Sequence, residues 1–202
     1  MSFVHKWVPG SEGASRTLLL LHGTGGNESD LIPLGQALDP EANILSPRGK
    51  ILEHGMPRFF KRLAEGVFDQ EDLKFRTAEL AEWIASASAQ YGVAGGLTAV
   101  GYSNGANIAA SLLLSGVATF DDAVLLRAMV PFEPTSLPDL RGKRILMLNG
   151  TRDPIIPQAN SKRLAELLSA AGAEVDLRWT NTGHGLEQGE IVAASEWLTT
   201  AV

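Results

Sequence analysis

Residues 97–105 read LTAVGYSNG, and this stretch decides the fold class. Its first four residues predict a short buried strand, and the small apolar residues 104–115 predict a helix directly after it. Between them stands Gly101-x-Ser103-x-Gly105, the pattern of a sharp strand-to-helix turn that lifts a serine hydroxyl above the end of a sheet. We expect a side chain at position 101 or 105 to collide with the neighbouring strand or helix. A serine between glycines also occurs by chance in ordinary turns, so the pattern gains its meaning from the rest of the chain.

The alternation of strand and helix continues on both sides of this turn. Apolar runs predict strands at 18–21, 43–45, 123–126, 144–148 and 174–179, and helical spacing predicts helices at 73–91, 158–171 and 187–201. Strands that read as continuous apolar runs are covered on both faces. The sequence therefore predicts an α/β fold, with a mainly parallel twisted sheet, helices on both faces and functional groups at the carboxyl edge of the strands.

Length and composition exclude several classes of protein. The 202 residues show no shift in composition, so we expect one domain spanning 1–202. The absence of cysteine excludes disulfides, thiolate metal sites and cysteine nucleophiles. A net charge of -6 gives no basic surface for nucleic acid or for an anionic membrane. No apolar run approaches the ~20 residues of a membrane span or forms a signal segment, so we expect a cytoplasmic protein without membrane insertion.

Three residues at predicted strand ends suggest nucleophilic catalysis, because a serine hydroxyl needs a base and the base needs an orienting acid. His184 follows the strand 174–179, and Asp153 follows the strand 144–148 in a loop that contains two prolines. The alternative for Asp153 is a turn or helix-cap residue. The chain order Ser103, Asp153, His184 predicts a catalytic triad. The other histidines are weaker candidates for the base, namely His5, His22 and His54.

A glycine loop after the first long strand predicts the oxyanion hole that acyl transfer requires. One donor is expected to be the backbone N–H of Asn104, and the other that of Thr24 in the sequence HGTGG at 22–26. Gly25 lets the backbone approach a substrate closely. A phosphate-binding loop is the competing interpretation, but its Lys-Ser/Thr ending is missing. We expect His22 to hold this loop in shape.

With these residues in place, the chain resembles α/β-hydrolases of the carboxylesterase/phospholipase family, which includes acyl-protein thioesterases, and within it bacterial MhqD-type hydrolases. The resemblance is carried by 21–28, 46–50, 58–62, 65–69, 101–107 and the loops of Asp153 and His184. It implies Ser103 as nucleophile, Asp153 as acid, His184 as base, oxyanion donors at Thr24 and Asn104, and a homodimer. The chemistry of such a triad needs no cofactor and no metal. Dienelactone hydrolases share the fold but usually carry a cysteine nucleophile, so the absence of cysteine predicts that the chain lies outside that branch.

The segment 53–69 is predicted to be one long irregular connection, and such connections often form binding loops. Aromatic rings there would contact an acyl or aryl group, and arginines would bind a carboxylate. The alternative is that the phenylalanines fill the core and the basic residues are solvated. The candidate substrate-binding residues are Gly25, Arg48, Arg58, Phe59, Phe60 and Ile155.

The sequence thus predicts a serine carboxylesterase without a large cap domain, acting on small to medium acyl substrates. A thioesterase or lysophospholipase-type hydrolase is the first alternative, since ester, thioester and lactone carbonyls all suit this chemistry. A non-catalytic ligand-binding protein with a hydrolase fold and a small peptidase are the others.

Overall fold

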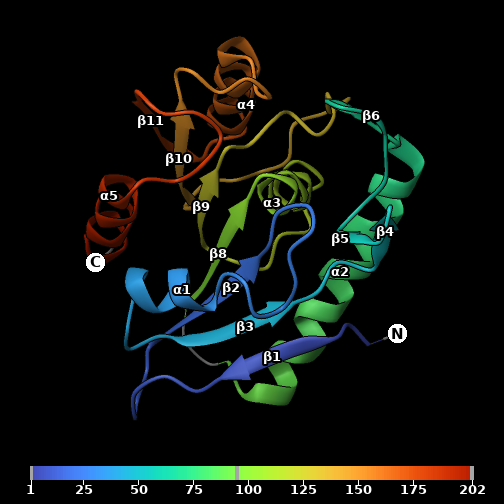
Figure 1. Cartoon of the computed structure of the whole chain (residues 1–202). Helices are drawn as coiled ribbons and strands as arrows, with labels where there is room; N and C mark the ends of the chain where they lie inside the picture. Colours follow the sequence, from blue (N-terminus) through green and yellow to red (C-terminus); the bar gives the residue numbers. More distant parts are fainter. Residues whose placement is uncertain (1, 94–95, 201–202) are drawn as a thin grey trace.

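The computed structural model describes residues 2–93 and 96–200, which form a seven-stranded sheet between helices (Figure 1). The sheet contains, in spatial order, β1 (His5–Val8), β3 (Asn43–Pro47), β2 (Arg16–Leu21), β8 (Gly96–Tyr102), β9 (Asp122–Leu126), β10 (Arg144–Gly150) and β11 (Glu174–Thr180). All neighbouring strands are parallel except β1, which runs antiparallel to β3 at one edge. The predicted mainly parallel sheet is confirmed.

Helices cover both faces of this sheet, and alternate residues of each strand explain why. Leu18 and Leu20 of β2 pack in a buried cluster with α1 (Ile32–Leu38) and α5 (Gln188–Thr199). Leu19 and Leu21 point to the other face, which is covered by α2 (Gln70–Tyr91), α3 (Asn104–Leu114) and α4 (Gln158–Ala170). Successive strand residues point to opposite faces. A strand buried on both sides therefore needs an unbroken apolar run.

The helix predictions hold with small shifts at their ends. The long helix α2 begins three residues earlier than predicted, at Gln70, where the Asp69 side chain accepts a hydrogen bond from the backbone of Asp72. That N-terminal cap was the missed signal. The short helix α1 was not predicted, because seven residues that include Pro33 and Gly35 give little periodicity. The predicted last helix ran to Ala201, which lies outside the described residues.

The prediction of one irregular segment over 53–69 was wrong. Two small hairpins occupy it: β4 (Ile51–Glu53) pairs with β5 (Met56–Arg58), and β6 (Arg62–Ala64) pairs with β7 (Val67–Phe68). In the first turn His54 and Gly55 both have positive φ, 51° and 81°, as a two-residue hairpin turn requires. The strands are too short to show an alternating pattern, so only the glycines marked the turns.

Parallel strands end at one edge of the sheet, and this brings the candidate residues together. Ser103 follows β8, Asp153 follows β10, His184 follows β11 and Thr24 follows β2. These four strands lie next to one another in the sheet except that β9 separates β8 from β10. Within the described parts of the chain, no helix is both long and apolar enough to span a membrane.

Candidate active site

The turn at Ser103 has the strained geometry that its sequence predicts. Ser103 has φ 52° and ψ -112°, and its backbone N–H donates to the Leu126 carbonyl at 2.8 Å. A Cβ at Gly101 would lie 2.6 Å from the carbonyl oxygen of Gly105, and one at Gly105 would lie 1.9 Å from that of Leu21. The expected collision at both positions is confirmed. The strain of a non-glycine residue at positive φ is held in place by this close packing.

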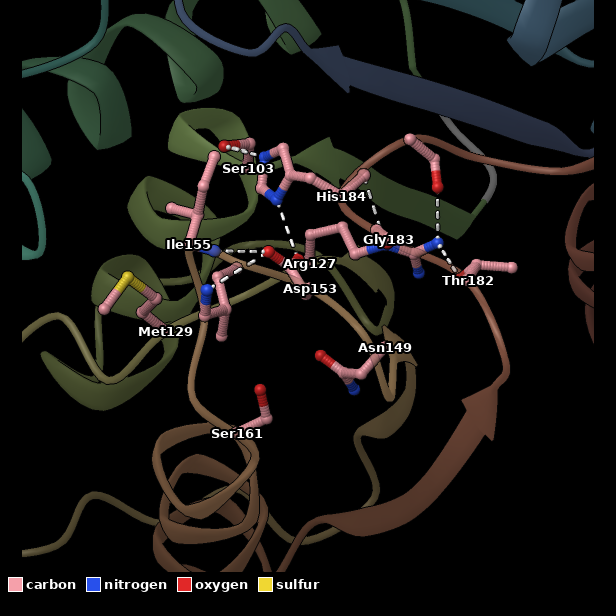
Figure 2. A network of polar contacts seen from close by, with 12 residues as sticks. Ser103, Arg127, Met129, Asn149, Asp153, Ile155, Ser161, Thr182, Gly183 and His184 are labelled. Atoms are coloured by element: carbon pink, nitrogen blue, oxygen red, sulfur yellow. Dashed lines mark hydrogen bonds and ion pairs between the residues drawn. The ribbon is translucent and has the colours of Figure 1, made fainter.

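Ser103, His184 and Asp153 form one continuous chain of hydrogen bonds (Figure 2). Nε2 of His184 lies 3.0 Å from the Ser103 hydroxyl, and Nδ1 lies 2.8 Å from Oδ2 of Asp153. The other oxygen of Asp153 accepts the backbone N–H groups of Ile155 and Ile156 at 2.8 and 3.1 Å. A carboxylate only accepts, so Nδ1 carries the proton and Nε2 is free to accept the serine proton. The structure therefore brings the three predicted residues together.

Two backbone N–H groups lie beside this serine and are available to an oxyanion. Thr24 and Asn104 both line the same cavity as Ser103. In the described parts of the chain, neither of their backbone N–H groups takes part in the loop and cap hydrogen bonds. Asn104 is the first residue of α3, where a helix leaves its N–H groups without intrahelical partners. Both donors come from strand ends that β2 and β8 hold side by side.

The side chain of His22 connects the glycine loop at 22–26 to the segment after β3. It is buried, with Nδ1 2.7 Å from the Gly23 carbonyl and Nε2 2.9 Å from the backbone nitrogen of Gly49. Because the Gly49 N–H must donate, Nε2 is an acceptor and the imidazole is neutral. Burial lowers the pKa of His22, which favours the same neutral form. These contacts agree with a structural role.

The cavity beside Ser103 has a volume of about 340 Å³, and the structure divides the predicted substrate-binding residues into two groups. Arg58 and Ile155 line the cavity. The other four lie outside its lining, namely Gly25, Arg48, Phe59 and Phe60. A larger cavity of about 480 Å³ lies between α2 and residues 132–136, and it includes none of the three hydrogen-bonded residues.

The predicted pocket roles of Phe59, Phe60 and Arg48 are therefore corrected. Both phenylalanine rings are buried in the core between the sheet and α2, where apolar surface is removed from water. The guanidinium of Arg48 forms an ion pair with Glu28, with Nη2 and Oε1 2.7 Å apart. Periodicity could not separate these positions from pocket positions, because the hairpins that turn them inward are not visible in the sequence.

A second arginine, Arg62, lines the cavity with Arg58 and was not predicted. Nη1 of Arg58 donates to the Thr24 hydroxyl at 2.5 Å. Nε of Arg62 donates to Glu53 at 2.9 Å, and the other Glu53 oxygen lies 3.2 Å from Nε of Arg58. Burial lowers the pKa of Arg58, and the neighbouring charge of Arg62 lowers it further. The carboxylate of Glu53 lies outside the cavity lining and thus pairs with two arginines, Arg58 and Arg62, that line the cavity.

Sequence reasoning also missed Arg127, which follows β9 directly. Its side chain is fully buried and lies against the loop that carries His184 (Figure 2). A charged residue after an apolar strand was the only available signal. Such a residue is more often solvated, and its partners in the His184 loop and at Glu190 lie more than 50 residues away along the chain.

The fold and the turn at Ser103 define the class of protein, an α/β-hydrolase. Residues 57–192 match the model of the dienelactone hydrolase family, and the chain belongs to that family. The prediction from the missing cysteine, that the chain lies outside this branch, was therefore wrong. The absence of cysteine excludes a thiol nucleophile, but it does not exclude family membership.

Several relatives are similar over almost the whole chain. The hydrolase MhqD of Bacillus subtilis (strain 168) is 46% identical, over 94% of this chain and 95% of that protein. The crystal structure of the Bacillus cereus carboxylesterase is 49% identical, with a TM-score of 0.95, covering 99% and 95% of the two chains. The structure of YahD with malic acid is 31% identical, with a TM-score of 0.94 and full coverage of both chains. These comparisons show a hydrolase of the dienelactone hydrolase and esterase type.

Proposed function

We propose that this protein is a serine carboxylesterase that works through an acyl-enzyme, with Ser103 as nucleophile, His184 as base and Asp153 as acid. The observation that carries the proposal is the unbroken hydrogen-bonded chain from Asp153 through His184 to Ser103. Ser103 lines a cavity together with Thr24 and Asn104, whose backbone N–H groups are available to an oxyanion. The likeness to a carboxylesterase of known structure supports an ester as substrate. A homodimer stays a prediction that light scattering of the purified protein would test.

The geometry suits the two halves of an acyl-transfer reaction. The Ser103 hydroxyl attacks the ester carbonyl while Nε2 of His184 takes its proton, and the imidazolium that forms is stabilised by Asp153. The N–H groups of Thr24 and Asn104 bind the negative oxygen of the tetrahedral intermediate. His184 then protonates the departing alcohol. Water repeats the attack on the acyl-enzyme, and the proton returns to Ser103 as the acid leaves.

The replacement Ser103→Ala tests the nucleophile directly. We expect hydrolysis of p-nitrophenyl acetate to fall by about 10³-fold or more, because the covalent route is lost, while the circular dichroism spectrum stays unchanged. A fluorophosphonate should label the wild-type protein at Ser103 and leave the variant unlabelled. Near wild-type activity in Ser103→Ala would refute the nucleophile. Absence of labelling and of turnover in the wild type would favour the non-catalytic binding protein.

We further propose that the preferred substrate carries a carboxylate besides its ester group. The guanidinium groups of Arg58 and Arg62 line the cavity, and guanidinium binds carboxylate through paired hydrogen bonds. Burial of Arg58 is costly without a full complement of negative charge, and a substrate carboxylate would supply it. Glu65 also lines the cavity, but its side chain is exposed and water screens its charge. YahD, a relative, has been solved with malic acid, which is a dicarboxylic acid.

A pair of substrates with acyl chains of four carbons, one charged and one neutral, tests this preference. The p-nitrophenyl monoester of succinic acid and neutral p-nitrophenyl butyrate should be compared in Arg62→Gln and in Arg58→Gln. We expect kcat/KM for the succinate ester to fall about 10-fold or more relative to the butyrate ester, because a hydrogen bond to a charged group contributes about 1.5–3 kcal/mol. Arg48→Gln is the matched control, since Arg48 is paired with Glu28 outside the cavity lining. Equal losses on both esters would remove the carboxylate preference and leave the esterase proposal intact.

A further inference from the structure

The guanidinium group of Arg127 is surrounded by acceptors from the loop that carries His184. Nε lies 3.2 Å from the carbonyl oxygens of both Gly183 and His184, and Nη2 donates to the Gly185 carbonyl at 2.7 Å. Nη2 also donates to the Thr182 hydroxyl at 3.0 Å. Three successive carbonyl groups therefore point at one cation. The backbone can meet this condition only in a narrow range of conformations.

A second set of contacts fixes Arg127 itself. Nη1 donates to the Leu148 carbonyl of β10 at 3.0 Å, and both Nη atoms lie 2.7 Å from the carboxylate of Glu190. The side chains of Arg127 and Glu190 are 0% and 2% exposed. Glu190 lies in the first turn of α5 and also accepts the backbone N–H of Glu187 and the Thr180 hydroxyl. The bidentate pair thus ties the guanidinium to α5 and, through Thr180, to the end of β11, and the hydrogen bond to Leu148 ties it to β10.

The backbone at Arg127 is held in an unusual conformation. Its φ is 60°, a region that costs free energy for a residue with a side chain. The backbone N–H nevertheless donates to the Leu148 carbonyl at 3.0 Å, next to the last paired residues of β9 and β10. Residues held at positive φ persist only where the surrounding structure determines them fully. Here the conformation turns the arginine beneath the His184 loop (Figure 2).

The loop of Asp153 is tied to the same segment. The backbone N–H of Arg152 donates to the Thr182 carbonyl at 3.0 Å, and that of Thr151 donates to the Thr180 carbonyl at 2.8 Å. On the opposite side, the Tyr102 hydroxyl, next to Ser103 in the chain, donates to the His184 carbonyl at 3.0 Å. The distances of the Ser103–His184–Asp153 chain therefore depend on where residues 182–185 lie.

We propose that Arg127 is the positioning residue of the active site, which holds residues 182–185 so that His184 reaches Ser103 and Asp153 together. Arg127 contacts no reacting atom and acts through its contacts with the Thr182 hydroxyl and the three carbonyl groups. The inference rests on the proposed serine esterase function, but it makes a separate claim about geometry. Lysine cannot replace the planar fork, because a single ammonium group has fewer donors and no fixed plane.

Two variants separate this role from a purely structural one. Arg127→Lys keeps the charge beside Glu190 and loses the fork. The double variant Arg127→Met/Glu190→Met removes the buried pair without leaving an unpaired charge, and such replacements are often neutral or stabilising. Arg16→Lys is the matched control, because Arg16 also joins a carboxylate and a backbone carbonyl, those of Asp39 and Leu198, away from the His184 loop. All kinetics are measured at a temperature where circular dichroism shows each protein folded.

We expect kcat for p-nitrophenyl acetate to fall about 10-fold in Arg127→Lys and about 10²-fold in the double variant, since an ångström of misplacement at a reacting group costs about 10²-fold. KM should stay within about twofold, and Arg16→Lys should match the wild type. A second readout is the downfield NMR resonance of the Nδ1 proton of His184, which should be present in the wild type and broadened or lost in the double variant.

A folded double variant with wild-type kcat and an intact Nδ1 resonance would overturn the positioning role. A parallel rise of KM and loss of kcat in the Arg16→Lys control would also overturn it, because the effect would then be a general one. If Ser103→Ala kept its activity, the esterase proposal would fail. The NMR comparison would still decide whether Arg127 holds His184.

Discussion

The close approach of α3 to β2 makes Gly105→Ala a sharp test of how the active-site turn is built. A Cβ at position 105 would lie 1.9 Å from the Leu21 carbonyl oxygen, 2.4 Å from its carbon and 2.6 Å from the His22 oxygen. The two Leu21 atoms belong to the backbone of the central strand β2, which is paired on both sides, and His22 follows it directly, so this backbone cannot move aside cheaply. The helix must shift instead, and with it the Asn104 N–H relative to the Thr24 loop.

The expected destabilisation follows from two opposing contributions. Alanine in a helix is favoured over glycine by about 1 kcal/mol, whereas overpacking costs about 1–3 kcal/mol and more where backbone is the obstacle. We expect a net loss of about 2 kcal/mol, which lowers Tm by roughly 4–8 °C in a chain of this size. The loss of kcat should exceed the loss of folded protein, because the two N–H groups proposed to bind the oxyanion, those of Thr24 and Asn104, separate.

Thermal and urea unfolding, each followed by circular dichroism, measure this effect. The matched control is Gly189→Ala in α5, where an added Cβ meets nothing within 4 Å. That variant should be neutral or gain up to about 1 kcal/mol in the free energy of unfolding. An unchanged or raised Tm in Gly105→Ala, with wild-type kcat, would refute the packing argument.

Three further outcomes are expected. Burial lowers the pKa of His22 in the folded state, so below about pH 6.5 the unfolded chain binds more protons and the wild type loses stability as the pH falls. His22→Gln should show a smaller decrease in the free energy of unfolding over this pH range. If urea titrations gave the variant the same pH dependence as the wild type, this explanation would be contradicted. Glu190→Gln should lose about 3 kcal/mol at pH 7, because it leaves Arg127 buried without its counter-charge. Burial alone would raise the pKa of Glu190, but hydrogen bonds, first among them that from Arg127, lower it below its ordinary value. The difference in free energy of unfolding between wild type and Glu190→Gln should therefore shrink as the pH falls through and below 4.5. A difference that did not change with pH would contradict the charge argument. Asp153→Asn should keep its Tm within a few degrees of the wild type. Its kcat should fall about 10⁴-fold, because the His184 imidazole adopts the wrong tautomer. If kcat fell less than about 10-fold across the pH-rate profile, Asp153 would not be the orienting acid.

The order of elements could be predicted because each leaves a local trace. Apolar runs such as 18–21 and 144–148 predict strands. Gly101 and Gly105 predict the sharp turn at Ser103, and the structure shows why glycine is needed at position 105, where the backbone packs against Leu21. Ser103, Asp153 and His184 could be chosen because each follows a strand, and parallel strands end at one edge. The distances between their side chains depend in addition on the position of residues 182–185, which only the structure shows.

Charged and aromatic residues in the segment 53–69 could not be placed in this way. Hairpins of two or three residues per strand show no period. Whether Phe60 faces the core or Arg62 faces the cavity therefore depends on the turn at His54 and on contacts with α2.

By itself the sequence determined the α/β fold class with its mainly parallel sheet, the position of the nucleophile candidate and the chemistry that the strand ends can perform. Only the tertiary structure decided which arginines line the cavity beside Ser103 and which are buried elsewhere or paired at the surface. Arg48, Arg58 and Arg127 look alike in the chain, yet one pairs at the surface, one lines the cavity and one is fully buried. The physical reason is that a long charged side chain is placed by its partners, and those partners come from segments that meet only when the sheet has formed.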